Sequence, residues 1–266
     1  MRQRRCVGMP LASIVGVCLL AGLNPTSVCQ TPSAKTAHTL HDVLPEYIQE
    51  FFLSEAVRSQ EHGEVQLTVA GTDFRDHRSA ADGKSAALDF EYGITRRFQF
   101  AMELPYGIQS TETSELPVSW STMSASLLYQ LVRSNYPFAL SAAMGVSLPV
   151  TSRGQTSLEP ELLAAKQFGT LQIHTSFIPE LSKDDKSLAY NVAAVRPIAH
   201  DLRPTLEFSG RRNAGINTFY VTPGIYQHLP HRLEIGMGVP IGASSLSSPV
   251  GVVVKMTWEF GGDDND

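Results

Sequence analysis

Large apolar residues alternate with small or polar residues along most of the chain between residues 61 and 260. The last run is the clearest, because one face of it is wholly apolar: Val252, Val254, Met256, Trp258 and Phe260. A period of two predicts β-strands, since successive side chains of a strand point to opposite faces of a sheet. Twelve strands are predicted, near residues 63–73, 84–94, 97–108, 119–132, 137–150, 156–167, 170–181, 187–198, 201–211, 216–228, 231–242 and 249–260.

These strands favour an all-β fold, a single antiparallel transmembrane β-barrel of about twelve strands. The apolar faces continue for nine or more positions, which suits tilted strands that cross a bilayer. Twelve is an even number, and short connections alternate with mostly longer, more polar ones, as in bacterial outer-membrane barrels. A soluble sheet protein is the alternative, but it needs another layer to cover about twelve apolar strand faces.

The first thirty residues have the pattern of a secretory signal peptide. Three arginines precede the apolar stretch Leu11–Leu23, and Pro25 ends it. All three cysteines lie in residues 1–30, so no disulfide or thiolate site is expected in the exported chain. The segment holds three of the 21 basic residues and none of the 26 acidic ones. An acidic exported protein without cysteine is expected in the periplasm or outer membrane of a Gram-negative bacterium, and the strand pattern favours the outer membrane.

Three further regions are expected after the signal peptide: a periplasmic linker with a short helix at 31–60, the barrel at 61–260, and an acidic tail at 261–266. The N-terminal helix is predicted over Pro45–Gln60, with Pro45 as its first residue and apolar residues on one side. We expect this helix at the periplasmic rim, and a plug inside the barrel is the alternative. The closing strand ends at Phe260, an aromatic end typical of strands that bind the barrel assembly machinery.

If the apolar faces contact outer-membrane lipid, the other faces line a lumen. Nine acidic and three basic residues are assigned to it: Asp89, Glu91, Glu103, Glu159, Glu161, Glu180, Glu207, Glu234 and Glu259, with Arg203, Arg211 and Lys255. A negative interior favours cations and disfavours anions. In the alternative interpretation these charges pair with one another or with water in a generic wet interior. Small inward residues such as Gly236 and Gly238 leave free space, or room for a plug.

Aromatic residues are expected to form a girdle at the periplasmic rim, where amphipathic rings prefer the membrane interface. Its members lie near the strand ends: Phe98, Tyr129, Phe138, Trp258 and Phe260.

Several short segments carry a family resemblance: Glu91–Phe98, Glu103–Tyr106, Gly145–Pro149, Tyr220–Gly224 and Arg232–Gly236. With the closing strand they resemble the outer-membrane "transporter" barrels that are grouped with the phenol meta-pathway degradation proteins, over about residues 60 to 260. The chain departs from that family at Arg96, where an acidic residue is frequent, and at Val150-Thr151, where a glycine is frequent. The resemblance implies an outer-membrane channel or transporter for small solutes, with hydrophobic or aromatic compounds as candidates, and it assigns no site residue.

Other function classes have less support. A mean hydropathy of -0.07 excludes a bundle of membrane helices, and a net charge of -5 argues against a nucleic-acid partner. An outer-membrane lipid-modifying hydrolase is one alternative, but the nearest hydroxyl and base, Ser176 and His174, point inward by parity rather than toward lipid. A structural or adhesive barrel is the other, with its function in the loops.

Histidine pairs with a spacing compatible with metal occur in a linker and in a turn, without acidic residues at matching distance: His38 with His41, and His228 with His231. We therefore expect no catalytic residue, no metal and no cofactor.

Overall fold

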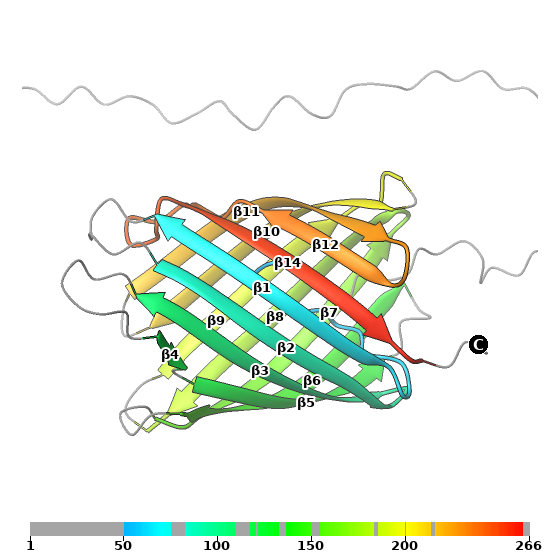
Figure 1. Ribbon diagram of the computed structural model, residues 1–266, viewed down its shortest axis with the longest axis horizontal. Helices are drawn as coiled ribbons and strands as arrows, with labels where there is room; N and C mark the ends of the chain where they lie inside the picture. The colour runs from blue at the N-terminus through cyan, green and yellow to red at the C-terminus, as the bar shows by residue number, and fades with distance from the viewer. Residues whose placement is uncertain are drawn as a thin grey trace, which may run out of the picture. The chain divides into compact units, whose positions relative to one another are not determined.

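The computed structural model describes residues 51–75, 83–109, 118–120, 122–132, 137–150, 155–183, 186–199, 201–213 and 216–262. These residues form one closed antiparallel barrel (Figure 1). Its strands are β1 (Val65–Arg75), β2 (Gly83–Thr95), β3 (Phe98–Gln109), β4 (Val118–Trp120), β5 (Thr122–Val132), β6 (Phe138–Pro149), β7 (Ser157–Phe168), β8 (Leu171–Ser182), β9 (Lys186–Val195), β10 (Leu202–Asn213), β11 (Ile216–Leu229), β12 (Leu233–Gly238), β13 (Ile241–Gly242) and β14 (Val250–Phe260).

The barrel closes because β1 pairs with β14 along eleven residues, from Val65 opposite Phe260 to Arg75 opposite Val250. The fourteen β-segments occupy twelve strand positions around the barrel. β4 and β5 both pair with β3, and β12 and β13 both lie between β11 and β14. Pro240 falls in the gap between β12 and β13, where a residue without an N–H cannot continue the ladder. The predicted twelve-stranded antiparallel barrel is therefore confirmed.

The outward faces of the strands are apolar. Met144, Leu162 and Phe177 each expose half of their surface, and such residues occur around the whole barrel wall. Exposed apolar area of this extent is rare on soluble monomers and is the surface that a bilayer covers. Within the described residues no helix is present that could span a membrane.

The connections follow the predicted alternation only in part. Residues 96–97 and 169–170 are short turns at the end where the chain enters β1 and leaves β14. At the same end β9 stops at Val195 and β10 begins only at Leu202, whereas at the opposite end β10 stops at Asn213 and β11 already begins at Ile216. Loop length alone therefore distinguishes the two ends of this barrel less clearly than the sequence indicated.

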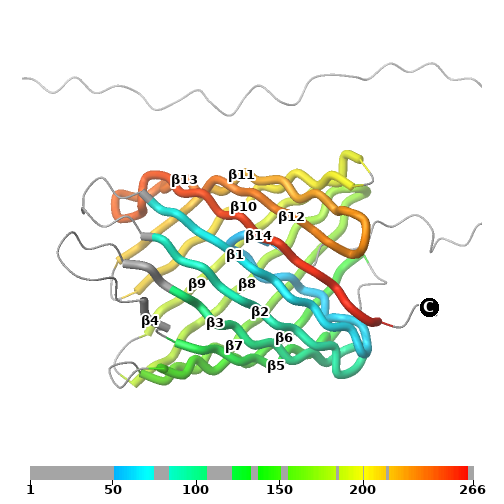
Figure 2. The backbone as a smooth tube through the Cα atoms, viewed as in Figure 1, coloured from blue at the N-terminus to red at the C-terminus, as the bar shows by residue number. Residues whose placement is uncertain are grey.

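The helix predicted over Pro45–Gln60 is not present in the part of that range that the structure describes. Residues 51–60 are bends and irregular backbone, and residues 45–50 lie outside the described residues. The described part lies within the barrel, where Phe51 and Val57 are each 1% exposed, rather than at its rim. Figure 2 shows this segment as blue tube behind β1 and β14. Its backbone groups bond to side chains of the wall, which replace the bonds that a helix would supply.

Candidate functional site: a lumen occupied by residues 51–60

The two phenylalanines of the 51–60 segment contact aromatic side chains of the wall. The Phe51 ring meets the edge of His174 at 4.7 Å between centroids, and the Phe52 ring stacks on Tyr226 at 4.4 Å with 19° between planes. Glu207 of β10, which is wholly buried, accepts hydrogen bonds from Phe52 N (2.7 Å) and Leu53 N (2.8 Å). One carboxylate thus satisfies two consecutive backbone donors that would otherwise be buried without a partner.

Three inward-facing glycines make room for the stacked rings of Phe52 and Tyr226. A Cβ atom at Gly224 would overlap the Phe52 ring, and one at Gly238 would lie 2.9 Å from it. A Cβ atom at Gly236 would overlap the Tyr226 ring and lie 3.0 Å from the Phe52 ring. Glycine weakens a strand interior, and it often marks a place where another group approaches the backbone closely. We call Gly224, Gly236 and Gly238 the glycine slot. The slot and the Tyr226 ring hold Phe52 against the wall between β11 and β12.

A second apolar contact lies further along the segment. Val57 packs with Leu128, Ala139, Leu163 and Ala165, which come from β5, β6 and β7. The Ser141 hydroxyl donates a hydrogen bond to the carbonyl oxygen of Val57. The segment therefore touches opposite parts of the wall, from β11 to β5, and crosses the lumen.

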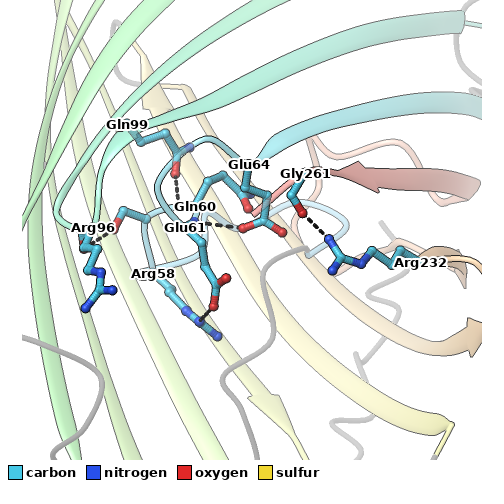
Figure 3. Close-up of polar contacts among 9 residues, drawn as sticks. Arg58, Gln60, Glu61, Glu64, Arg96, Gln99, Arg232 and Gly261 are labelled. Carbon is cyan, nitrogen blue, oxygen red and sulfur yellow. Dashed lines mark hydrogen bonds and ion pairs between the residues drawn. The ribbon is translucent and has the colours of Figure 1, made fainter. Parts of the chain in front are cut away.

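An amide network fixes the end of the segment nearest to β1. Gln60 N donates to Gln99 Oε1 (2.8 Å), and Gln60 Nε2 donates to Gln66 Oε1 (2.6 Å) and to Glu91 Oε2 (2.8 Å). Gln99 Nε2 donates to the same Glu91 oxygen at 2.8 Å. Figure 3 shows Gln60 and Gln99 turned toward each other beside the polar groups of the rim. Connected side-chain amides of this kind define one position for the chain.

The chain then leaves the lumen over Gly93. Gly63 N donates to Gly93 O (2.8 Å), and Gly93 N donates to Glu64 O (2.9 Å). A Cβ atom at position 93 would overlap the carbonyl oxygen of Glu61. An ion pair between Arg58 and Glu61 (3.2 Å) and a hydrogen bond from Arg232 to Gly261 O complete the rim (Figure 3).

A cavity of about 630 Å³ remains in the lumen beside the 51–60 segment. Its lining combines one side of residues 51–58 with inward residues of the strands, and six of its members are acidic: Glu55, Asp89, Glu91, Glu103, Glu159 and Glu161. Three are basic: Arg58, Arg211 and Lys255. The described cavity wall therefore carries twice as many acidic as basic side chains.

Several of the residues assigned to the lumen from the sequence make specific contacts. Arg203 Nη1 lies 3.2 Å from Glu234 Oε2, and Arg211 Nη2 lies 3.8 Å from Glu180 Oε2. Glu159 accepts hydrogen bonds from Ser147 (2.5 Å) and Ser157 (3.0 Å). Pairing within the wall thus neutralises some of the predicted charges.

Other members of that set have different surroundings. Glu91 and Glu207 bind the 51–60 segment, whereas Asp89, Glu103, Glu161 and Lys255 line the cavity. Glu259 is half-buried near the end of β14.

The aromatic residues assigned to the girdle lie near strand ends, at the rim where the chain enters β1 and leaves β14. Phe98 pairs with Tyr129 across β3 and β5, Phe138 begins β6, and Trp258 and Phe260 end β14. Tyr129 is 44% exposed, Phe138 41% and Phe260 53%, so these rings point out of the barrel.

The histidines singled out in the sequence have different surroundings. His174 is 1% exposed beneath Phe51, and the Ser176 hydroxyl accepts a hydrogen bond from Asn191 (2.8 Å). Both therefore lie where a lipid substrate cannot reach them. His228 Nδ1 lies 3.9 Å from Glu234 Oε2, and His38 and His41 fall outside the described residues.

The sequence did not indicate that Phe52 binds to Tyr226 and the glycine slot. The alternation placed Gly236 and Gly238 inward, which allowed for a plug, but it did not indicate which residue fills the slot. Gln60, Gln66 and Gln99 also went unrecognised, because isolated glutamines in polar positions form no motif.

Comparisons with known proteins place the fold. No protein-family model and no curated protein sequence matches the chain. Among solved structures, an outer-membrane channel from Pseudomonas putida F1 superposes with a TM-score of 0.55 at 12% identity, covering 77% of this chain and 98% of that one. The KdgM porin gives 0.54 at 10% identity (74% and 99% covered), and the NanC porin 0.54 at 9% (72% and 97%).

The chain has the fold of the outer-membrane channel barrels. The likeness to these porins extends over nearly their whole length and concerns the fold alone. The grouping with phenol meta-pathway proteins stays an expectation from the sequence segments.

Proposed function

We propose that the protein is a passive channel for small solutes in the outer membrane of a Gram-negative bacterium. The observation that carries this proposal is a closed barrel with an apolar outer surface around a polar cavity of about 630 Å³. A closed barrel leaves no unpaired strand edge in lipid, and a polar interior is suited to the passage of water-soluble molecules.

The charges of the cavity wall support a preference for cations. Six acidic side chains against three basic ones give the passage a negative potential, and low-dielectric walls strengthen it. The KdgM porin has been solved in complex with disordered oligogalacturonate, whose sugars each carry a carboxylate. The acidic wall of this chain disfavours a polyanion of that kind, so the shared fold does not extend to that solute.

The family resemblance and the cavity support a class of solute. Hydrophobic or aromatic compounds of small size fit a passage of this volume that the 51–60 segment narrows from one side. Outer-membrane lipid covers the apolar surface, and the closing strand with Phe260 is the part of the chain that we expect the assembly machinery to bind.

Planar-bilayer recording tests the channel. The refolded protein is expected to conduct, and the reversal potential in a KCl gradient is expected to show cation preference. Glu103→Gln with Glu159→Gln should reduce that preference, and Glu64→Gln at the rim serves as the matched control. Anion preference contradicts the acidic passage, and absence of conductance in both the native chain and Phe52→Ala contradicts the channel.

A further inference from the structure

The contact of Phe52 with the wall has the form of a ligand-binding site. The ring stacks on the Tyr226 ring and lies against the glycine slot, whose three glycines come from two adjacent strands. Each of these glycines weakens its strand relative to alanine. A wall that only had to close the barrel would not need such a flat recess. The recess accepts a planar ring, because the Tyr226 ring offers a stacking surface and the missing Cβ atoms of Gly224 and Gly238 leave space for the ring.

The hydrogen bond beside the ring defines the rest of the ligand. Phe52 N donates to Glu207 Oε1 at 2.7 Å, and the carboxylate is wholly buried. The Cα and Cβ atoms of Phe52 join this nitrogen to its ring. Phe52 therefore presents to the wall an aromatic ring, two carbons and a nitrogen donor, which is the skeleton of a 2-arylethylamine.

We propose that the glycine slot, Tyr226 and Glu207 form a binding site for small aromatic amines of this skeleton, and that Phe52 occupies the site as an internal competitor. The proposal deepens the proposed function, on which it rests for the route of the ligand through the lumen. A protonated amine supplies the buried carboxylate with a charge-assisted hydrogen bond. A neutral ring adds no charge-assisted bond to that carboxylate, and an aromatic acid brings a like charge against it.

Calorimetric titration of the full chain in detergent with phenethylamine tests the site. Phe52→Ala removes the competing ring, so this variant is expected to bind phenethylamine at least about tenfold more tightly than the native chain. Val57→Ala is the matched control, because it removes a buried contact of the same segment at another part of the wall. It should leave the affinity within about twofold of the native value. Equal affinity of Phe52→Ala and the native chain overturns the proposal.

Two related compounds test separately whether the planar ring and the protonated amine are needed for binding. For Phe52→Ala, 2-cyclohexylethylamine keeps the charge without a planar ring, and 3-phenylpropionate keeps the ring with the opposite charge. Both are expected to bind at least about tenfold more weakly than phenethylamine. If either binds equally well, the assigned ligand class is wrong.

Refilling the recess gives a second test. Adding Gly224→Ala to Phe52→Ala places a methyl group where the ring was, and should abolish the gained affinity. This variant has not folded if its boiled and unboiled samples migrate identically on a denaturing gel. In that case the double variant Phe52→Ala with Glu207→Gln is tested instead. That change should reduce the preference for phenethylamine over 3-phenylpropionate, and an unchanged preference overturns the proposal. Tight binding without conductance would contradict the channel alone, and conductance without binding to Phe52→Ala would contradict this site alone.

Discussion

The ring of Phe52 is stacked on the ring of Tyr226 with 4.4 Å between centroids. Tyr226 belongs to the barrel wall, whereas Phe52 belongs to the segment that precedes the first strand. The contact makes this segment part of the packed interior, together with Phe51, Ala193, Val195 and Val253. The size of the passage therefore depends on how strongly ten residues are bound to the wall.

Removing the Phe52 ring should enlarge the passage. A buried Phe→Ala change typically costs about 3–5 kcal/mol, and loss of a stacked partner is part of that cost. Phe52→Ala is therefore expected to raise the fraction of time in a high-conductance state by roughly tenfold or more in single-channel recording. Phe177→Ala, the same change at a half-exposed position on the outer face, should leave that fraction unchanged. A similar increase in both variants would show that the effect does not come from the segment.

Glu207→Ala should release the segment by a different route. It leaves the backbone donors of Phe52 and Leu53 without their acceptor, at a cost of about 1–3 kcal/mol for each buried group. Ser54→Cys reports this release, because Ser54 is 8% exposed and all native cysteines lie in residues 1–30. A thiol reagent should label this cysteine at least about tenfold faster in the Glu207→Ala chain. Glu207→Gln keeps one acceptor oxygen and should have a smaller effect, so equal labelling in both would contradict this role.

Gly93→Ala should impair folding of the barrel. The added methyl group overlaps the carbonyl oxygen of Glu61 at the place where the chain crosses from the lumen into β1. Both backbone hydrogen bonds of Gly93 to this crossing would be strained. The folded fraction, measured from the migration of unboiled samples on a denaturing gel, is expected to fall. Gly71→Ala is the control, since a Cβ there meets nothing within 4 Å, and equal yields from the two variants would contradict the steric argument.

The position of the outer surface in the membrane can be tested with an arginine scan of β7. Leu162 is 51% exposed in the middle of the strand, and Phe168 is 52% exposed at its end. Leu162→Arg should destabilise the inserted barrel by about 2–4 kcal/mol, and Phe168→Arg by about 1 kcal/mol or less. Urea unfolding in lipid vesicles measures both values. Equal losses at the two positions would contradict a bilayer centred on the strand.

The barrel could be predicted from the sequence because period-two alternation is a local pattern. Leu88, Phe90 and Tyr92 face outward in β2, and the predicted strand ends differ from the observed ones by a few residues in most strands. The exceptions have local causes. β12 ends at Gly238, short of the predicted residue 242, because Pro240 cannot donate to the ladder.

The segment at 51–60 could not be predicted in the same way. Phe51, Phe52 and Ala56 have a spacing that suits one side of a helix. In the structure these residues lie on irregular backbone and pack against side chains of the barrel wall. Phe52 binds beside β11 and Val57 binds near β5 and β7, so its apolar residues point to different parts of the barrel. Contacts between residues so distant along the chain leave no periodic pattern. The inward glycines indicated only that space existed.

The amide network around Gln60 shows the same limit at the polar end. Gln66 and Gln99 lie on β1 and β3, on either side of β2, and both accept a hydrogen bond from Gln60. Gln60 and Gln99 in turn donate to the same carboxylate, Glu91 of β2. The charges were more accessible to prediction, because parity within a strand assigns a side chain to one face. The pairing of these charges could not be predicted. Arg203 and Glu234 are separated by 31 positions in the chain, and they meet because β10 and β12 lie on either side of β11.

The apolar cluster around Phe51 and Phe52 is expected to form late in folding. Its other members lie on β9, β11 and β14, so the pocket for these rings exists only after the last strand has paired with the first. Contacts of such long sequence separation form late, because the loop entropy must be lost first. Until then two adjacent phenylalanines at the N-terminal side of the barrel stay in water, and a chaperone that shields aromatic pairs would protect the chain from aggregation during that interval.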